Sequence, residues 1–235
     1  MNTKYMMKKQ RYWLLYLLGI VCLSSCNNEN EEQNFSDNLL MNLTAQVNKV
    51  KSRVSSDNSW VADGTEQISL NVGEKKVTFK VVDIDGTLEP VNEDNQLYWP
   101  TPLKPQMVTA WYPATEGNNL PAIWNVQADQ SGTGFQQSDI LYTSTEVSFQ
   151  GNKALPFEHL TTKVIVNLKG NGKNDTELAG AVVTIENAVL TGSFSEGVLT
   201  ASSGSGKTIT PQKLMVTNGY AFSCQALLIP QDMKE

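Results

Sequence analysis

The sequence predicts an all-β fold. Short runs that alternate apolar and polar residues, or that are rich in β-branched residues, recur between clusters of Gly, Asn, Asp and Pro, as in a β-sandwich. No window beyond residue 60 has the spacing of a convincing amphipathic helix. The expected strands are QISLNV (67–72), KVTFKVV (76–82), QMVTAWY (106–112), DILYTSTEVSF (139–149), KVIVNL (163–168), AVVTIENAVL (181–190) and YAFSCQALLI (220–229).

One segment, residues 36–50, fits two periodicities. Its apolar residues repeat every three to four positions, as in a helix, and also every second position, as in a strand. The helical stripe would hold Leu39, Leu43, Val47 and Val50, and the strand face would hold Leu39, Met41, Leu43, Ala45 and Val47. Periodicity leaves both structures open.

The first 25 residues have the order of a secretion signal. Lys4, Lys8, Lys9 and Arg11 precede the apolar stretch 13–23, and small residues follow it. This stretch is shorter than the roughly 20 residues that a membrane-spanning helix needs. We therefore expect residues 1–25 to be a signal peptide that is removed.

The processing site, Leu23-Ser24-Ser25-Cys26, resembles the lipobox of bacterial lipoprotein precursors. Cleavage is then expected between Ser25 and Cys26, with lipid attached to Cys26 and the protein anchored in the outer membrane at the cell surface. An ordinary secretion signal with a chance cysteine is the alternative. The acidic segment 26–36 cannot bury enough apolar area to fold, and it is expected to be a flexible tether.

Charge and cysteine usage exclude other classes. The net charge of -6 and pI near 4.9 disfavour nucleic acid as a partner. Cys22 leaves with the signal and Cys26 carries lipid, so Cys224 has no disulfide partner. Alternation in the strand 220–229 places Cys224 on an apolar face, which predicts a buried structural thiol.

The segment GNKALP (151–156) predicts a domain boundary, because its Gly, Asn and Pro interrupt the strand pattern. An N-terminal β-sandwich over 37–153 and a second domain over 154–235 follow from it. The second domain has about 80 residues, fewer than the roughly 100 of a typical sandwich, so it is expected to be incomplete.

Two strings resemble enzyme motifs. FKVVDIDGTL, with Asp83 and Asp85, is similar to the first motif of haloacid-dehalogenase-type phosphotransferases, but flanking helices and a downstream acidic pair are missing from the sequence. The simpler interpretation is a strand that enters a tight turn at Asp85-Gly86.

ASSGSGKT (201–208) satisfies a permissive P-loop pattern, with Lys207 and Thr208 at the phosphate and magnesium positions. Pro211 stops the helix that a P-loop requires, so a polar hairpin loop is expected. His159 is the only histidine and is expected to be a packed or hydrogen-bonded strand residue. The sequence therefore predicts a protein that is not an enzyme, with no catalytic residues, cofactor or metal.

A cluster of aromatic residues allows two interpretations. Exposed rings could stack on sugars and would indicate a glycan-binding surface lipoprotein, whereas buried rings would form the core of the first sandwich. We favour the core. The residues are Tyr98, Trp99, Trp111, Tyr112 and Trp124.

Several segments, taken in order, resemble the fimbrillin family, the lipoprotein-derived subunits of fimbriae in anaerobic Gram-negative bacteria. The most specific are Phe157-x-His159 in LPFEHLTTKVIVNL and Pro230-Gln231 in ALLIPQ. The others are LLMNLTAQVNKVKSRV, NSWVADGTEQISL, QLYWPTPLKPQMVTAWYP, SDILYTS and VVTIENAVLTGSF, so the resemblance spans residues 39–231.

The resemblance implies two tandem transthyretin-like β-sandwiches, no catalysis, and polymerisation with other fimbrial subunits by strand exchange. In that family a protease removes the first strand and a strand of another subunit fills its place. Here the removable strand would be about 39–47, and cleavage would fall at Lys49, Lys51 or Arg53, of which Arg53 is our expectation; a solvated basic turn is the alternative. Family members usually continue beyond the Pro-Gln element, so we expect this chain not to donate a C-terminal strand.

Overall fold

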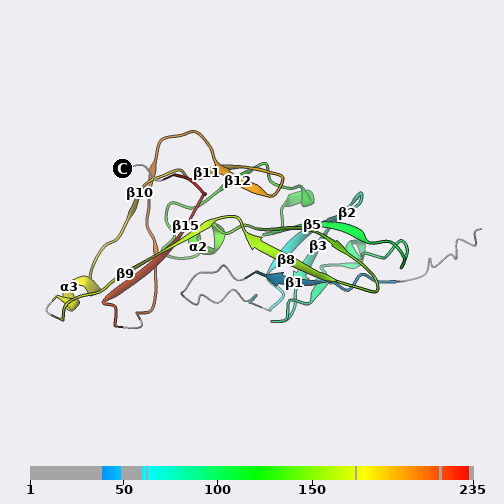
Figure 1. The fold of residues 1–235 in the computed structure, drawn as a ribbon, viewed down its shortest axis with the longest axis horizontal. Coiled ribbons are helices and arrows are strands. Elements are labelled where there is room, and N and C mark those ends of the chain that lie inside the picture. Colours follow the sequence, from blue (N-terminus) through cyan, green and yellow to red (C-terminus); the bar gives the residue numbers. More distant parts are fainter. Residues whose placement is uncertain (1–38, 49–59, 62, 173, 217–218, 233–235) are drawn as a thin grey trace, which may run out of the picture. The chain divides into compact units, whose positions relative to one another are not determined.

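The structure, a computed structural model, describes residues 39–48, 60–61, 63–172, 174–216 and 219–232, and the fold of these residues is all-β (Figure 1). The prediction of fold class is confirmed. The helices are short: η2 (Glu93–Asn95), η3 (Glu116–Asn118), α2 (Gly134–Gln137) and α3 (Asp175–Ala179).

A seven-stranded sheet holds the first half of the described chain. Its strands, in spatial order, are β1 (Thr44–Val47), β8 (Ala154–His159), β7 (Leu141–Val147), β5 (Gln106–Tyr112), β2 (Gln67–Val72), β3 (Lys75–Val81) and β4 (Leu88–Pro90). Neighbours pair antiparallel except β1 and β8, which are parallel. The sheet closes on itself, because Thr44 of β1 also forms an antiparallel bridge with Thr87, next to β4.

Three smaller sheets follow. β6 (Ile123–Asn125), β11 (Thr191–Ser195) and β12 (Val198–Ala201) form one, with β11 in the middle. The second pairs β10 (Ile185–Ala188) with β13 (Lys207–Ile209), and the third places β15 (Phe222–Leu228) between β14 (Gln212–Lys213) and β9 (Thr162–Leu168). In the third sheet β15 is buried on both faces, whereas β9 is mostly half-buried.

The sequence periodicity located most long strands well. The expected runs 67–72 and 106–112 coincide with β2 and β5. The run 181–190 is strand only over Ile185–Ala188. The ambiguous segment 36–50 contains a strand, β1, and no helix among its described residues. Long-range pairing decided this, since the partners of β1 lie 40 to 110 residues further along the chain.

Two hydrophobic clusters fill the fold. The first lies inside the seven-stranded sheet and includes Leu43, Phe79 and Phe157. The second includes Val126, Ile140 and residues of the three smaller sheets. Tyr142 of β7 packs its ring edge-to-face on Phe194 of β11, with 5.2 Å between centroids, so a strand of the large sheet also contacts the second cluster.

The expected boundary between residues 153 and 154 stays a prediction. Residues 154–156, which the sequence suggested as a linker, belong to β8, and Leu155 lies in the first cluster. Val126 and Ile140, which precede that boundary, pack in the second cluster. The two clusters therefore draw on interleaved parts of the chain, and contacts join Asn38–Glu235 into one unit.

Candidate functional site

The candidate functional site is the place of the first strand. Residues 39–48 lie between the segment 86–99 on one edge and the segment 153–157 on the other. We call these two flanking segments, together with Trp60, the β1 seat. Figure 1 shows β1 alongside β8 within the sheet.

Both edges of residues 39–48 are hydrogen-bonded through the backbone. Odd-numbered residues bond to one side of the seat, and Thr44 and Asn48 bond to the other, as the pleat of a strand requires. On the first side the bonds are Trp99 N to Leu39 O (2.8 Å), Met41 N to Leu97 O (2.9 Å), Leu88 N to Leu43 O (3.1 Å) and Ala45 N to Gly86 O (2.7 Å). On the second side they are Thr44 N to Lys153 O (3.1 Å) and Asn48 N to Phe157 O (2.8 Å).

Alternate side chains of this segment enter the first cluster. Met41, Leu43 and Ala45 are buried, with 3%, 1% and 1% of their surface exposed. Asn42, which lies between Met41 and Leu43, and Gln46, which follows Ala45, are exposed. The segment therefore contributes both hydrogen bonds and apolar packing, which are the two properties that make strand complementation possible.

Gly86 allows the closest approach in the seat. Its φ of +81° is in the left-handed region, and a Cβ built on it would lie 1.9 Å from the carbonyl oxygen of Ala45. Only glycine fits there, because the residue needs this φ and because backbone occupies the space of a side chain. The turn that the sequence predicts at Asp85-Gly86 is confirmed, with Gly86 N donating to Asp83 O at 3.0 Å.

Trp60 contacts Ala45 of β1 in addition to the two flanking segments of the seat. Its indole Nε1 donates a hydrogen bond of 2.9 Å to the carbonyl oxygen of Ala45. The indole ring meets Tyr112 and Phe157 edge-to-face, with centroids 5.6 and 5.9 Å away. Periodicity did not reveal this contact; the signal available was the NSW string within the family resemblance.

Pro156 sits in β8 opposite Gln46 of β1. Proline has no backbone N–H, so it is tolerated only where a strand needs no donor. The bonds that flank it, from Thr44 to Lys153 and from Asn48 to Phe157, show that odd-numbered residues of β8 face β1, so the nitrogen of Pro156 faces away. β8 thus accepts β1 without losing a hydrogen bond to proline.

The first enzyme-like motif, residues 79–88, leads into this seat and overlaps it at residues 86–88. Asp83 Oδ1 accepts a hydrogen bond of 2.8 Å from Thr87 N, and the bonds from Thr87 hold the pKa of Asp83 below its ordinary value of 3.8. The carboxylate thus stabilises the turn that presents Gly86 to β1. Within the described ranges, no group of three or more His, Cys, Asp and Glu side chains could hold a metal ion.

The second enzyme-like motif forms a loop between strands of different sheets. It begins at the end of β12 and ends in β13, and these strands pair with β11 and β10, so the loop does not close the expected hairpin. An open hollow of about 970 Å³ lies beside it, lined by Gly204, Gly206 and Gln231 among others. Lys207, the phosphate position of a P-loop, is not among its lining residues.

His159 is a hydrogen-bonded strand residue, as expected. It ends β8, and its Nδ1 lies 2.9 Å from Oδ1 of Asp139, which also accepts a bond of 3.2 Å from Thr161 Oγ1. The adjacent Leu160 N donates to Ile140 O at 3.0 Å. These contacts hold the link between β8 and β9 against the segment that precedes β7.

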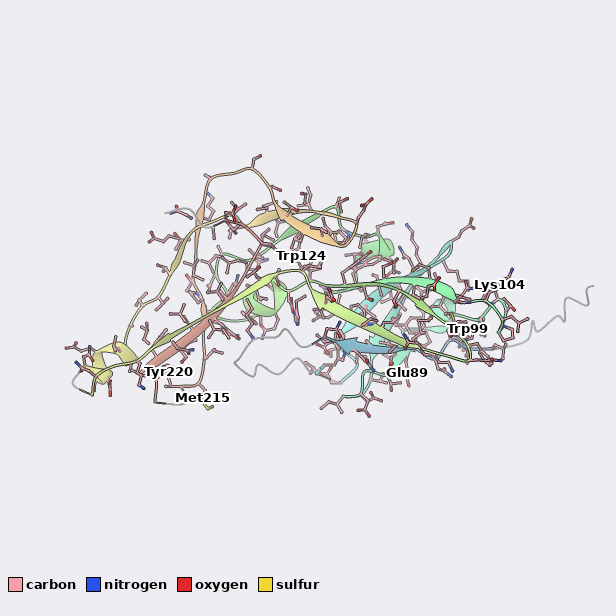
Figure 2. The ribbon with its side chains drawn as sticks, in the orientation of Figure 1. Glu89, Trp99, Lys104, Trp124, Met215 and Tyr220 are labelled. Carbon is pink, nitrogen blue, oxygen red and sulfur yellow. The ribbon has the colours of Figure 1, made fainter. Side chains whose placement is uncertain are left out.

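The aromatic cluster is mostly core. Trp111 is fully buried and Trp99 is 3% exposed, which confirms the core interpretation for both rings. Trp124 is half-buried against the second cluster and donates from Nε1 to Ser138 O at 3.0 Å. Figure 2 shows Trp99 and Trp124 in separate parts of the fold, so they do not form one platform.

Cys224 is buried in β15, as predicted, and burial raises the pKa of its thiol. Ser25, Cys26 and Arg53, the expected processing and lipid-attachment residues, lie outside the described residues. In the part of the chain that is described, no helix is long and apolar enough to cross a membrane.

Comparisons with known proteins agree with this architecture. A candidate cell adhesion protein from Bacteroides uniformis superposes with a TM-score of 0.59 and 20% identity, over 82% of this chain and 76% of that protein. A second candidate cell adhesion protein, from Bacteroides ovatus, gives 0.59 and 18% over 82% and 78%. No curated protein matches the chain in sequence.

The fold therefore belongs to a class of β-sandwich proteins with solved Bacteroides representatives. The sequence profile of the fimbrillin-like family matches residues 28–235. The chain belongs to the fimbrillin-like family, and so is a fimbrial or adhesin-like protein of the cell surface.

Proposed function

We propose that the protein is a structural subunit or accessory component of cell-surface fimbriae that assembles by β-strand complementation. It leaves the cytoplasm as a lipoprotein precursor, is cut between Ser25 and Cys26, and is anchored in the outer membrane by lipid on Cys26. A second cut at Arg53 then frees the first strand, and the β1 seat accepts a strand of another subunit.

The observation that carries this proposal is the position of β1. It is bonded on both edges and packed on one face, but the chain joins it to Trp60 and everything beyond only through residues 49–59. Arg53 falls in that connection. A single cut there would leave the strand in place by non-covalent contacts alone, so that it could be exchanged.

Loss of the first strand, with no other strand in its place, would raise the free energy of the folded subunit. Burial of a side chain such as Met41 or Leu43 contributes about 1.5–3 kcal/mol each, and loss of the strand would also expose paired backbone edges. An incoming strand with a similar residue pattern would restore both the apolar burial and the hydrogen bonds of the edges. Strand addition draws affinity from main-chain hydrogen bonds and specificity from alternate side chains.

Proteolysis of the mature protein tests the maturation step. Limited digestion with a trypsin-like protease, followed by N-terminal sequencing, should give a new N-terminus at Val54, and Arg53→Ala should abolish it while Lys51→Ala does not. Absence of any cut between Lys49 and Val54 would rule out this site.

Electron microscopy of cells tests the assembly role. Cells that lack the gene, and cells that carry only Arg53→Ala, should lose or shorten surface filaments, whereas cells with Lys51→Ala should keep them. Unchanged filaments in cells that lack the gene would contradict the proposed function.

Glycan binding, the alternative that the aromatic cluster suggests, has less support. It required Trp99 and Trp111 to face solvent, and both are buried. The description of the two similar structures as candidate cell adhesion proteins agrees with a surface role but names no ligand.

A further inference from the structure

We propose that the β1 seat selects its strand by side-chain size at three alternating positions, large, large and small, and that the small position, held here by Ala45, excludes strands with a larger side chain there. This inference rests on the proposed function, because it describes which strand of another subunit the seat would accept.

The three inward-facing positions, 41, 43 and 45, differ in the side-chain sizes that they would accept. Met41 and Leu43 fill space in the first cluster, so a smaller side chain there leaves a cavity. Ala45 is buried to the same degree with only a methyl group. The outward position of Gln46 is exposed and sets no limit on size.

Two hydrogen bonds hold the backbone at Ala45, so a shift away from the core to make room would strain or break them. Its N–H donates to Gly86 O at 2.7 Å, and its carbonyl oxygen accepts from Trp60 Nε1 at 2.9 Å. The Gly86 backbone is so close that even a methyl group on it would overlap Ala45 O. On the opposite edge, the neighbouring Thr44 N donates to Lys153 O at 3.1 Å.

A larger side chain at this position must therefore be accommodated by the core alone. Protein cores are close-packed, and added methylenes force side chains off their rotamers or shift the backbone. At Met41 the flanking hydrogen bond goes to Leu97, and no glycine approach constrains the strand there in the described residues. The seat is thus tightest at the Ala45 position.

Pairing also fixes the direction of an acceptable strand. β1 runs parallel to β8, with Ala45 opposite Leu155, and antiparallel to the segment at Thr87. The partner that fits is an extended segment of another subunit, with two large apolar residues and then a small one at every second position from N to C.

Peptide exchange tests the selection. The mature full-length chain, with a specific protease site in place of residues 52–56, is cut so that the first strand is held non-covalently. Labelled peptides with the sequence of residues 38–48 are then added, either unchanged or with Ala45→Leu, Leu43→Ala or Gln46→Leu. The last peptide adds the same side chain as the first variant at the neighbouring, exposed position.

We expect the Ala45→Leu peptide to bind at least about tenfold more weakly than the unchanged peptide. The Leu43→Ala peptide should lose roughly a hundredfold and the Gln46→Leu peptide less than about threefold. Equal affinity of the Ala45→Leu and Gln46→Leu peptides would overturn the inference and leave the proposed function standing.

A second measurement decides the inference without any exchange. In the uncut chain, Ala45→Leu should lower the thermal unfolding midpoint and Gln46→Leu should not. If the cut protein binds no peptide at all, the proposed function fails. Equal midpoints of the two uncut variants would refute the size limit at Ala45.

Discussion

The side-chain amide of Gln130 pairs with the backbone of Leu227 as if it were a neighbouring strand. Leu227 N donates to Gln130 Oε1 at 2.8 Å, and Gln130 Nε2 donates to Leu227 O at 2.8 Å. The side-chain amide of Gln231 pairs with the backbone of Val189 in the same way. Val189 N donates to Gln231 Oε1 at 2.8 Å, and Gln231 Nε2 donates to Val189 O at 3.2 Å. Two buried or half-buried glutamines thus satisfy backbone groups in the second half of the fold.

Gln130→Leu should destabilise the protein by about 2–4 kcal/mol, because it leaves the buried N–H and C=O of Leu227 without partners. Chemical denaturation followed by fluorescence measures the free energy of unfolding. The control is Gln136→Leu, an exposed glutamine of α2, which should change that free energy by less than about 0.5 kcal/mol. Equal effects of the two variants would contradict the role of the Gln130 pair.

Gly86→Ala should loosen the first strand. The new Cβ would overlap Ala45 O, and the φ of +81° is unfavourable for alanine. Gly73→Ala is the matched control, because Gly73 also has a positive φ, of +59°, but nothing lies within 4 Å of its Cβ position. Gly86→Ala should therefore cost at least about 2 kcal/mol more than Gly73→Ala, as measured by denaturant unfolding. A similar cost at both sites would refute the close approach.

Trp60→Phe should weaken the hold on β1, since phenylalanine keeps an aromatic ring but cannot donate to Ala45 O. The expected loss is about 1–3 kcal/mol, the cost of an unsatisfied buried carbonyl. Trp124→Phe removes a similar bond, to Ser138 O, far along the chain from β1. In protein cut between residues 49 and 59, only Trp60→Phe should speed release of the first strand, as followed by mass spectrometry.

Asp83 should make the stability of the β1 seat depend on pH. Its pKa is lowered by the bonds from Thr87, so the carboxylate stabilises the folded state above its ordinary pKa of 3.8, and this contribution is lost as pH falls through the lower, folded pKa. The thermal midpoint should fall less for Asp83→Asn than for the unchanged chain between about pH 6 and about pH 3. An equal fall of the thermal midpoint in Asp83→Asn and in the unchanged chain would contradict this role of Asp83.

Cys224 should resist thiol reagents in the folded protein. It is buried in β15, and the raised pKa of its thiol keeps it protonated at neutral pH. In a chain that starts after Cys26, labelling should be at least about tenfold slower in buffer than in denaturant. Rapid labelling of the folded protein would show that β15 opens readily.

Much of the fold could be predicted from short-range patterns in the sequence. β2 and β5 were located to the residue, because short alternating or apolar-rich runs bounded by turn residues are typical of strands. The burial of Cys224 and the turn at Asp85-Gly86 also followed from nearby residues. Short strands such as β6 and β13 were missed, since three residues carry too little periodicity to be recognised.

The all-β class and the family could be predicted from the sequence, since each depends on adjacent residues or on the order of motifs. The strand at residues 44–47, and the contacts of Gly86 and Trp60 with Ala45, became evident only in the three-dimensional structure. The groups that hydrogen-bond to β1 come from segments far away in the chain, so periodicity within 36–50 contains no information about them.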